Sequence, residues 1–354
     1  MQFRVGHMEI TNICNFKCTF CADSQMSRKR RIMSPDLFYR VIDEIASEQL
    51  AEAIALHVFG EPLIHRDVCE FIKYVKNKGL KLNITTNASL LEDKHIETIC
   101  SFMQNDEDSV HISFRSTNEA VFGIHGCNDT FDNYLRRIQD LIKMKISTES
   151  PFRLRLDVFW KTIFNYPVLL RNSKLMEYIL DAKSSHKLVK WIQDIVSEKP
   201  YYDKINYSIF GSTRTVNFHN NIVLCFQPLT ESIDSSFNNR MRASTGYCDM
   251  RYFTVFCDGK VGPCCNNYDA RISFGNVNDR SLKEILFDQK TLTFRKKMSC
   301  GKLPHEFCKL CRGHTNILGL TTKQVLNYIK VKIDPYGNRK FIFREEHNNY
   351  GDKK

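Results

Sequence analysis

Three cysteines near the start of the chain are spaced so that their side chains could bind one metal centre. Cys14, Cys18 and Cys21 form a C-x3-C-x2-C pattern. Thiolates at these spacings can converge from one loop on one face of a four-iron cluster, which leaves the fourth iron without a protein ligand. That iron could bind the amine and carboxylate of a small molecule and pass it an electron. The alternative is a zinc site with a fourth protein ligand, for which His7 is the nearby candidate.

The same segment resembles a known signature. Phe20 stands directly before the last cysteine, and the run CNFKCTFC resembles the motif of the radical S-adenosylmethionine (SAM) superfamily. The resemblance implies that a [4Fe–4S] cluster on Cys14, Cys18 and Cys21 cleaves SAM to methionine and a 5'-deoxyadenosyl radical, which then abstracts hydrogen from a substrate. It also implies an electron donor of the flavodoxin or ferredoxin type.

Further motifs of this superfamily follow at the ends of successive expected strands. The segment FGEP at 59–62 resembles the Gly-Gly-Glu-Pro motif that meets the methionine amine, and Thr86-Asn87 resembles Thr-Asn-Gly. Ser113 ends the next strand, where the superfamily places polar contacts to SAM. The resemblance therefore implies a set of SAM-binding residues: Phe20, Gly60, Glu61, Pro62, Thr86, Asn87, Ser113 and Arg115.

The chain departs from these motifs at three positions. A single glycine precedes Glu61, and Ala88 replaces a glycine, which raises a question about the conformation of that turn. Arg115 stands where relatives often carry an aspartate. It could bind an anionic substrate or the carboxylate of the cofactor, or it could be a solvated side chain.

A second group of cysteines lies in the last third of the chain. Cys248 and Cys264 flank a glycine, and Cys308 and Cys311 form a C-x2-C pair. Two thiolates from a hairpin and two from a short knuckle would make a four-ligand metal site. Their spacing resembles the auxiliary-cluster modules of the SPASM and twitch families. A structural zinc knuckle is the alternative.

The resemblance favours a twitch-type module, because no cysteine follows Cys311. It implies one auxiliary cluster, and therefore two [4Fe–4S] clusters in the chain. Cys265 or Cys300 could replace one of the four ligands. An auxiliary cluster suits net oxidation of a substrate radical, whereas a hydrogen-donating thiol would instead give epimerisation.

Hydrophobic periodicity predicts the elements that position these motifs. Ser34 and Pro35 suit the start of a helix. Helical patterns alternate with six strand-like segments, at 3–10, 53–59, 80–85, 110–114, 153–159 and 205–210. Such alternation predicts parallel strands with right-handed crossovers. Six units predict an α/β fold of the open, partial (β/α)6 TIM-like barrel type, in which chemistry collects at the C-terminal ends of the strands.

The pattern changes after residue 211. Residues 211–247 show little periodicity, so a long loop is expected there. Asp258-Gly259 predicts a β-hairpin, and 281–298 predicts a helix. We therefore expect a partial barrel at 1–225, a twitch-type auxiliary cluster domain at 226–330 and a polar tail at 331–354.

The composition is that of a globular chain of 354 residues, 42% of them hydrophobic. No apolar run reaches membrane-spanning length, and the N-terminus lacks the pattern of a signal peptide. We therefore expect a cytoplasmic protein with no membrane partner. The 14 cysteines are clustered, which favours reduced, metal-binding thiols over disulfides.

The net charge of +11 favours an acidic partner, although it could reflect a merely basic surface. A non-catalytic zinc- and nucleic-acid-binding protein is the alternative from another class. It would need a basic stripe with interleaved aromatic residues, and the dense basic run is limited to 28–31. Nucleic acid is therefore not the expected partner.

Two substrate classes remain open. A small polar metabolite, such as a sugar or an anionic phosphorylated compound, would make the protein a dehydrogenase or an epimerase. A peptide or protein substrate would make it a maturase. Only 13 residues precede Cys14, so we expect no N-terminal peptide-recognition domain, and this favours the metabolite.

Overall fold

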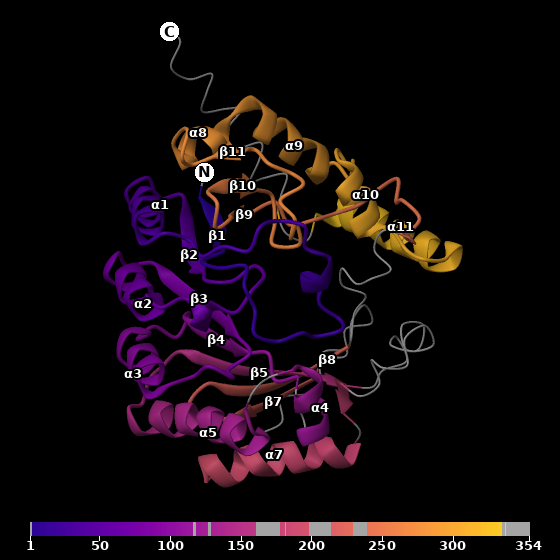
Figure 1. Ribbon diagram of the computed structural model, residues 1–354. Helices are drawn as coiled ribbons and strands as arrows, with labels where there is room; N and C mark the ends of the chain where they lie inside the picture. Colours follow the sequence, from indigo (N-terminus) through magenta and orange to yellow (C-terminus); the bar gives the residue numbers. More distant parts are fainter. Residues whose placement is uncertain are drawn as a thin grey trace. The chain divides into compact units, whose positions relative to one another are not determined.

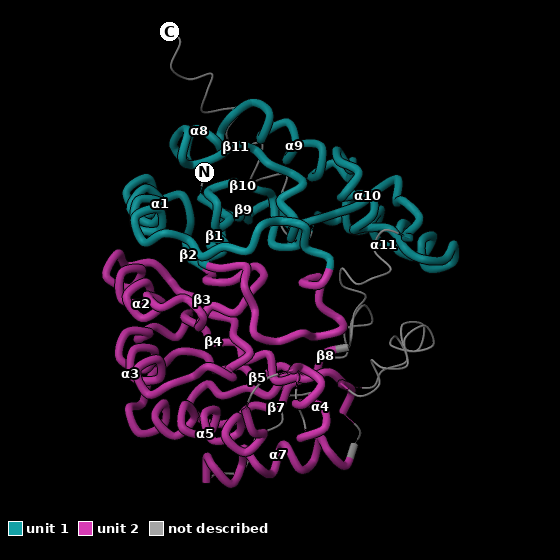
Figure 2. Tube along the Cα trace, viewed as in Figure 1, with its two compact units in different colours: residues 1–10, 25–54, 233–354 teal, residues 11–24, 55–232 magenta. Residues whose placement is uncertain are grey.

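The computed structural model describes residues 2–115, 118–126, 129–160, 178–180, 182–197, 214–228, 239–334 and 337. The chain divides into two compact units, which Figure 2 colours separately. Unit 1 contains residues 1–10, 25–54 and 233–354, and unit 2 contains residues 11–24 and 55–232. Each unit thus combines segments that are distant in sequence. The predicted domain boundaries at 225 and 330 stay a prediction.

Unit 1 combines the start of the chain with its C-terminal elements (Figure 1). Its strands are β1 (Phe3–Met8), β2 (Ala51–Ala55, whose last residue belongs to unit 2), β9 (Tyr252–Val255), β10 (Lys260–Gly262) and β11 (Gly275–Asn276). Its helices are α1 (Pro35–Ser47), α8 (Leu282–Phe287), α9 (Gln289–Ser299), α10 (Glu306–Arg312) and α11 (Ile317–Ile333). The strand order is β11-β10-β9-β1-β2. β1 is parallel to β9, whereas β10 is antiparallel to both β9 and β11.

Unit 2 contains a mostly parallel sheet with the order β3-β4-β5-β8-β7. Its strands are β3 (Lys81–Thr86), β4 (Ser109–Ile112), β5 (Arg153–Trp160), β6 (Ile179–Leu180), β7 (Arg214–Phe218) and β8 (Ile222–Pro228). Its α-helices are α2 (Val68–Asn77), α3 (Asp93–Phe102), α4 (Glu119–Ile124), α5 (Phe131–Ser147) and α7 (Ala182–Val196). The short 3-10 helices η1 (Ala22–Gln25) and η2 (Pro62–Ile64) lie in loops. Only β7 runs antiparallel to its neighbour among these described strands.

Side-chain alternation along β5 shows how the sheet of unit 2 separates its core from its polar face. Leu154, Leu156 and Val158 are fully buried. Because successive side chains of a strand point to opposite faces, Arg155 and Asp157 lie on the other face. Helices α2, α3 and α5 lie along one side of these strands in Figure 1. The opposite, more polar face is therefore the one available for binding and chemistry.

The predicted α/β class is confirmed, and the described strands close into a ring in neither unit, as expected for a partial barrel. Ser34 caps α1, because its hydroxyl accepts a hydrogen bond from the Leu37 amide at 3.3 Å. The predicted hairpin is also confirmed: β9 and β10 are antiparallel, and Gly259 takes a φ of +84° in the turn.

The expectation of a long loop at 211–247 is wrong over residues 214–228. There β7 and β8 form a hairpin, and β8 pairs in parallel with β5. Asn220 and Asn221 both have a φ of 57°, which suits the tight turns that favour asparagine. The strand predicted at 205–210 lies outside the described residues. Between the fifth and sixth predicted strands the described residues contain the helix α7, as the alternation indicated.

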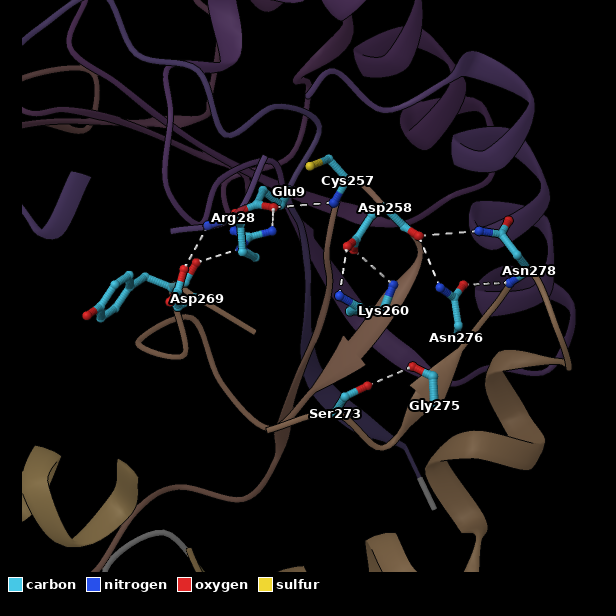
Figure 3. A network of polar contacts seen from close by, with 11 residues as sticks. Glu9, Arg28, Cys257, Asp258, Lys260, Asp269, Ser273, Gly275, Asn276 and Asn278 are labelled. Atoms are coloured by element: carbon cyan, nitrogen blue, oxygen red, sulfur yellow. Dashed lines mark hydrogen bonds and ion pairs between the residues drawn. The ribbon is translucent and has the colours of Figure 1, made fainter. Parts of the chain in front are cut away.

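Arg28, the first residue of the basic run, belongs to a buried polar network in unit 1 (Figure 3). Its guanidinium donates to both carboxylate oxygens of the fully buried Glu9, at 2.9 and 2.6 Å. The Cys257 amide donates to the same carboxylate at 3.3 Å, and Asp269 accepts from the Arg28 amide at 3.0 Å. A buried charge needs such a partner. Arg28 therefore stabilises the fold and does not contribute a free cation to a nucleic-acid stripe.

No helix in the described residues is both long enough and apolar enough to cross a membrane.

Candidate active site

The three N-terminal cysteines lie together in unit 2. Cys14, Cys18 and Cys21 line one cavity of about 230 Å³ and are not joined in disulfides. The same cavity is lined by most of the residues predicted to bind SAM: Phe20, Gly60, Glu61, Thr86, Asn87, Ser113 and Arg115. Pro62 does not line it and instead begins the short helix η2. The motifs predicted at successive strand ends are thus brought to one place.

Burial of the thiols disfavours free, nucleophilic thiolates in this cavity. Burial raises the pKa of Cys14 to about 12 and that of Cys18 well above its usual value, and the neighbouring thiols raise both further. Such thiols ionise when a metal binds them. In the described residues no three His, Cys, Asp or Glu side chains already surround one point as metal ligands. The donor set nevertheless fits an iron–sulfur cluster, because it offers three sulfurs in one partly buried cavity.

Gly60 lies against the backbone of the cysteine loop. Its φ is +90°, and a Cβ placed there would lie 2.5 Å from the Thr11 carbonyl oxygen and 2.9 Å from that of Ile13. The next amide, of Glu61, donates to the Ile13 carbonyl at 2.8 Å. Glycine is needed here both for the backbone conformation and for the close approach. The turn therefore holds Glu61 at a fixed place beside the cysteine loop.

We expect Gly60→Ala to destabilise the protein more than Gly79→Ala. Both glycines have positive φ, +90° and +74°, but a Cβ at Gly79 would meet nothing within 4 Å. The two variants share the conformational strain, so the steric clash should cost G60A at least about 2 kcal/mol more. Denaturant unfolding of both variants measures this difference, and SAM titration should show weaker binding only for G60A. Equal unfolding midpoints would contradict the close packing.

The Glu61 carboxylate connects two of the predicted motifs. It accepts hydrogen bonds from the Thr86 hydroxyl at 2.6 Å, the Asn87 amide at 2.7 Å and the Leu63 amide at 3.2 Å. Burial raises its pKa to about 7, against the lowering effect of these hydrogen bonds. The predicted contact of Glu61 with the methionine amine stays a prediction. What sequence reasoning missed is that the same carboxylate holds the turn after β3.

The turn after β3 keeps a left-handed backbone without a glycine. Ala88 has a φ of +63°, which lies in the left-handed region. The alanine that replaces the family's glycine therefore keeps the conformation that a glycine would take. The Asn87 side chain donates to Asn15 at 2.9 Å and lies 4.0 Å from the Cys14 sulfur. The Thr86 hydroxyl accepts a hydrogen bond from the Ala88 amide at 2.9 Å. This bond helps to hold Ala88 in the left-handed conformation.

Arg115 is held at the edge of the cavity by β5 and its neighbours. Its guanidinium lies 3.8 Å from the centre of the Phe159 ring and donates to the Asp157 carbonyl at 3.1 Å. Burial lowers its pKa, and the nearby Asp157 opposes that shift. The Asp157 carboxylate itself accepts from Arg155 at 2.6 Å and from Gln227 at 3.0 Å. These three residues of β5 and β8 form a polar group that the sequence reasoning missed.

Aromatic side chains surround the cysteine loop. Phe20 packs edge-on against Phe159 and Tyr178, with ring centres 5.2 and 5.0 Å apart. The buried His125 stacks on Phe16 at 4.4 Å, and its Nδ1 lies 3.2 Å from the Cys18 sulfur. Burial lowers the pKa of His125 to about 4, so the ring is neutral. No motif or spacing pointed to this histidine, which is 107 residues from Cys18.

The second group of cysteines comes together in unit 1. Cys248, Cys264, Cys308 and Cys311 all line one cavity of about 170 Å³. Burial raises the pKa of Cys308 to about 12 and that of Cys264 well above its usual value. Neither Cys265 nor Cys300 lines this cavity, and Cys300 is exposed at the end of α9. The four predicted thiols thus form a donor set that fits a fully thiolate-ligated cluster.

Residues 8–152 match the family model of the Radical SAM superfamily. Residues 248–312 match that of SPASM, an iron–sulfur cluster-binding domain. The chain therefore contains a Radical SAM domain and a SPASM domain. Radical SAM proteins use SAM and a [4Fe–4S] cluster, and SPASM domains bind auxiliary iron–sulfur clusters. The matched ranges contain the two groups of cysteines that line the two cavities.

Curated proteins resemble part or most of the chain at low identity. A tungsten-containing aldehyde ferredoxin oxidoreductase cofactor-modifying protein of Pyrococcus furiosus is 23% identical over 312 residues, which is 82% of each chain. A cysteine-type anaerobic sulfatase-maturating enzyme of Clostridium perfringens is 24% identical over 333 residues, 84% of this chain and 83% of the relative. An S-adenosylmethionine-dependent nucleotide dehydratase of Selenomonas ruminantium is 26% identical over 163 residues, 44% of this chain and 56% of the relative.

Solved structures include similar chains. BtrN in complex with AdoMet and 2-DOIA has a TM-score of 0.48 and 15% identity, covering 84% of this chain and 87% of BtrN. Streptococcus suis SuiB bound to S-adenosylmethionine has a TM-score of 0.49 and 15% identity, covering 81% of this chain and 66% of SuiB.

Proposed function

We propose that this radical SAM enzyme abstracts hydrogen from a small polar metabolite, such as a sugar or a phosphorylated compound, and completes a dehydrogenation or an epimerisation. One observation carries the proposal: three thiols line a single cavity together with Glu61, Thr86 and polar groups at the ends of β3 and β4. The lining is mostly apolar, but its hydroxyls, amides and guanidinium can orient a polar ligand by hydrogen bonds.

The proposed cofactor sites are the two sets of cysteines. Cys14, Cys18 and Cys21 would hold the SAM-binding cluster, and an auxiliary [4Fe–4S] cluster would be held by Cys248, Cys264, Cys308 and Cys311. When bound, the first cluster supplies the electron that cleaves SAM, and the auxiliary cluster supplies a site that can take up an electron. A flavodoxin- or ferredoxin-type protein is the proposed electron donor, and the net charge of +11 favours an acidic carrier.

The protein side chains around the cysteines would bind and orient the cofactor. Glu61 would accept a hydrogen bond from an ammonium group, while its other hydrogen bonds fix Thr86 and Asn87. Phe16 and Phe20 would shield the cysteine loop from water; Phe16 stacks on His125, and Phe20 packs against Phe159. Excluding water protects a reactive intermediate from side reactions.

The basic and polar groups of β4, β5 and β8 support an anionic or multiply hydroxylated substrate. Arg115 lines the cavity, and a guanidinium matches the geometry of a phosphate or carboxylate. The polar group of Arg155, Asp157 and Gln227 lies on β5 and β8, and the Asp157 carbonyl also accepts a hydrogen bond from Arg115. Such groups can both donate to and accept from sugar hydroxyls.

A maturase acting on a peptide or protein is the second candidate. The observation in its favour is the Clostridium perfringens sulfatase-maturating enzyme, which is similar over 84% of this chain. The two candidates differ in the substrate that loses hydrogen. One assay that follows the transfer of that hydrogen can therefore separate them.

Deuterium transfer tests the proposal. The reconstituted protein is incubated anaerobically with SAM, a reductant and deuterated candidates, which are sugars, sugar phosphates and peptides containing serine or cysteine. We expect deuterium in 5'-deoxyadenosine with a member of the first two groups and none with the peptides. Transfer from a peptide alone would replace the metabolite with the maturase assignment. Absence of SAM cleavage with every candidate and without substrate would contradict both.

A further inference from the structure

Arg312 contacts one of the proposed auxiliary ligands through two of its nitrogen atoms. It is the last residue of α10 and directly follows Cys311. Its Nε lies 3.1 Å and its Nη2 2.6 Å from the Cys248 sulfur. In the described part of the chain its guanidinium donates to no other atom. The planar fork of an arginine is thus directed at a single sulfur, 64 residues away in sequence.

The surroundings of Arg312 are built to hold the side chain there. A Cβ at Gly246 would lie 2.8 Å from the Arg312 Cγ, so the glycine leaves room for the stem of the arginine. Arg312 lines the same cavity as the four cysteines. The carboxylate nearest in sequence on α10, Glu306, is engaged by Arg242 and Lys309. Glu306 therefore does not neutralise the Arg312 guanidinium, whose charge faces the cavity lined by the cysteines.

The Arg312 charge lies beside the proposed ligand set. Its guanidinium contacts the Cys248 sulfur and lines one cavity with all four cysteines. An arginine side chain stays charged at physiological pH. A cluster that gains an electron gains negative charge, and a nearby cation stabilises that reduced form.

We propose that Arg312 raises the reduction potential of the auxiliary cluster, by donating two hydrogen bonds to the Cys248 sulfur and by placing a fixed positive charge beside the ligand set. Hydrogen bonds to the sulfurs and net charge are two of the features that set the potential of an iron–sulfur cluster. Arg312 is thus a positioning residue that makes the cluster a better electron acceptor. The inference rests on the ligand set of the proposed function.

The test is a reductive titration of the auxiliary cluster in the full reconstituted chain. Cys14, Cys18 and Cys21 are replaced by alanine in every sample, so that the auxiliary cluster alone gives the EPR and absorbance signal. In this background Arg312→Gln removes the charge, and Arg312→Lys keeps the charge but loses the fork. Arg242→Gln is the matched control, because that exposed arginine pairs with Glu306 on the same helix.

We expect R312Q to lower the ratio of reduced to oxidised cluster about tenfold at a fixed potential, which is about 59 mV for a one-electron couple. R312K should show a smaller shift in the same direction, and R242Q none. A merely structural role would change cluster content or stability but not the midpoint.

Equal midpoints for the unsubstituted and R312Q samples, with iron retained, would overturn the inference. If R312Q fails to hold the cluster, R312K decides, because an unchanged midpoint there would overturn it as well. Absence of auxiliary iron from the unsubstituted sample would instead contradict the proposed ligand set, so the two failures can be told apart.

Discussion

Replacing Cys14, Cys18 or Cys21 by alanine is expected to remove about four iron atoms per chain and to lower SAM cleavage more than about 100-fold. The three sulfurs line one cavity, and loss of a direct ligand should exceed the effect of changing an outer hydrogen bond. Iron and sulfide analysis, together with chromatography of 5'-deoxyadenosine, measures both effects. About four iron atoms should remain, because the second group of cysteines is separate in sequence and lines another cavity.

Cys69→Ala is the control for this series. Cys69 lies on α2, where its thiol contacts the Lys94 carbonyl, and it does not line the cavity. C69A should keep both its iron and its SAM cleavage. Normal SAM cleavage by C14A, C18A or C21A would contradict the proposed ligand role of that cysteine.

Replacing Cys248 or Cys308 by alanine is expected to separate SAM cleavage from substrate turnover. The auxiliary iron should be lost, while the cavity around Cys14 stays intact and SAM is still cleaved. We expect the ratio of SAM cleaved to substrate consumed to rise about tenfold or more, because the substrate intermediate lacks its electron acceptor. Parallel quantification of 5'-deoxyadenosine and product measures this ratio.

Two further cysteines provide matched controls for that experiment. Cys300 is exposed, and Cys265 follows Cys264 in sequence but does not line the cavity. C300A and C265A should therefore keep the auxiliary iron, whereas C264A should lose it. Loss of iron in C265A with retention in C264A would reassign the ligand. Unchanged coupling in C248A after complete loss of auxiliary iron would contradict the role of that cluster.

Local signals in the sequence predicted local structure well. Ser34 and Pro35 indicated the start of α1, and Asp258-Gly259 indicated the β9–β10 hairpin, because caps and tight turns depend on residues within a few positions. The β7–β8 hairpin was missed although Asn220-Asn221 is a recognisable turn signal. The surrounding residues do not alternate clearly between polar and apolar side chains, so the two strands were not predicted.

Contacts between distant residues could not be predicted in the same way. The alignment of motifs at strand ends indicated that Glu61 and Thr86 would be close, but their direct hydrogen bond depends on side-chain packing. Nothing local marks His125 as a neighbour of Cys18, or Arg312 as a neighbour of Cys248. These pairs form because the fold brings together segments that are far apart in sequence. They can therefore be identified only from the three-dimensional structure.

Binding of SAM to the reduced N-terminal cluster is the most direct test of the account. The protein with alanine at Cys248, Cys264, Cys308 and Cys311 is reduced, and its EPR and ENDOR spectra are compared with and without SAM labelled with ¹⁵N at the amine and ¹⁷O at the carboxylate. We predict a changed EPR signal and hyperfine coupling to both labels, since one iron lacks a protein ligand. A spectrum that SAM leaves unchanged, or a protein that binds zinc without sulfide, would contradict it.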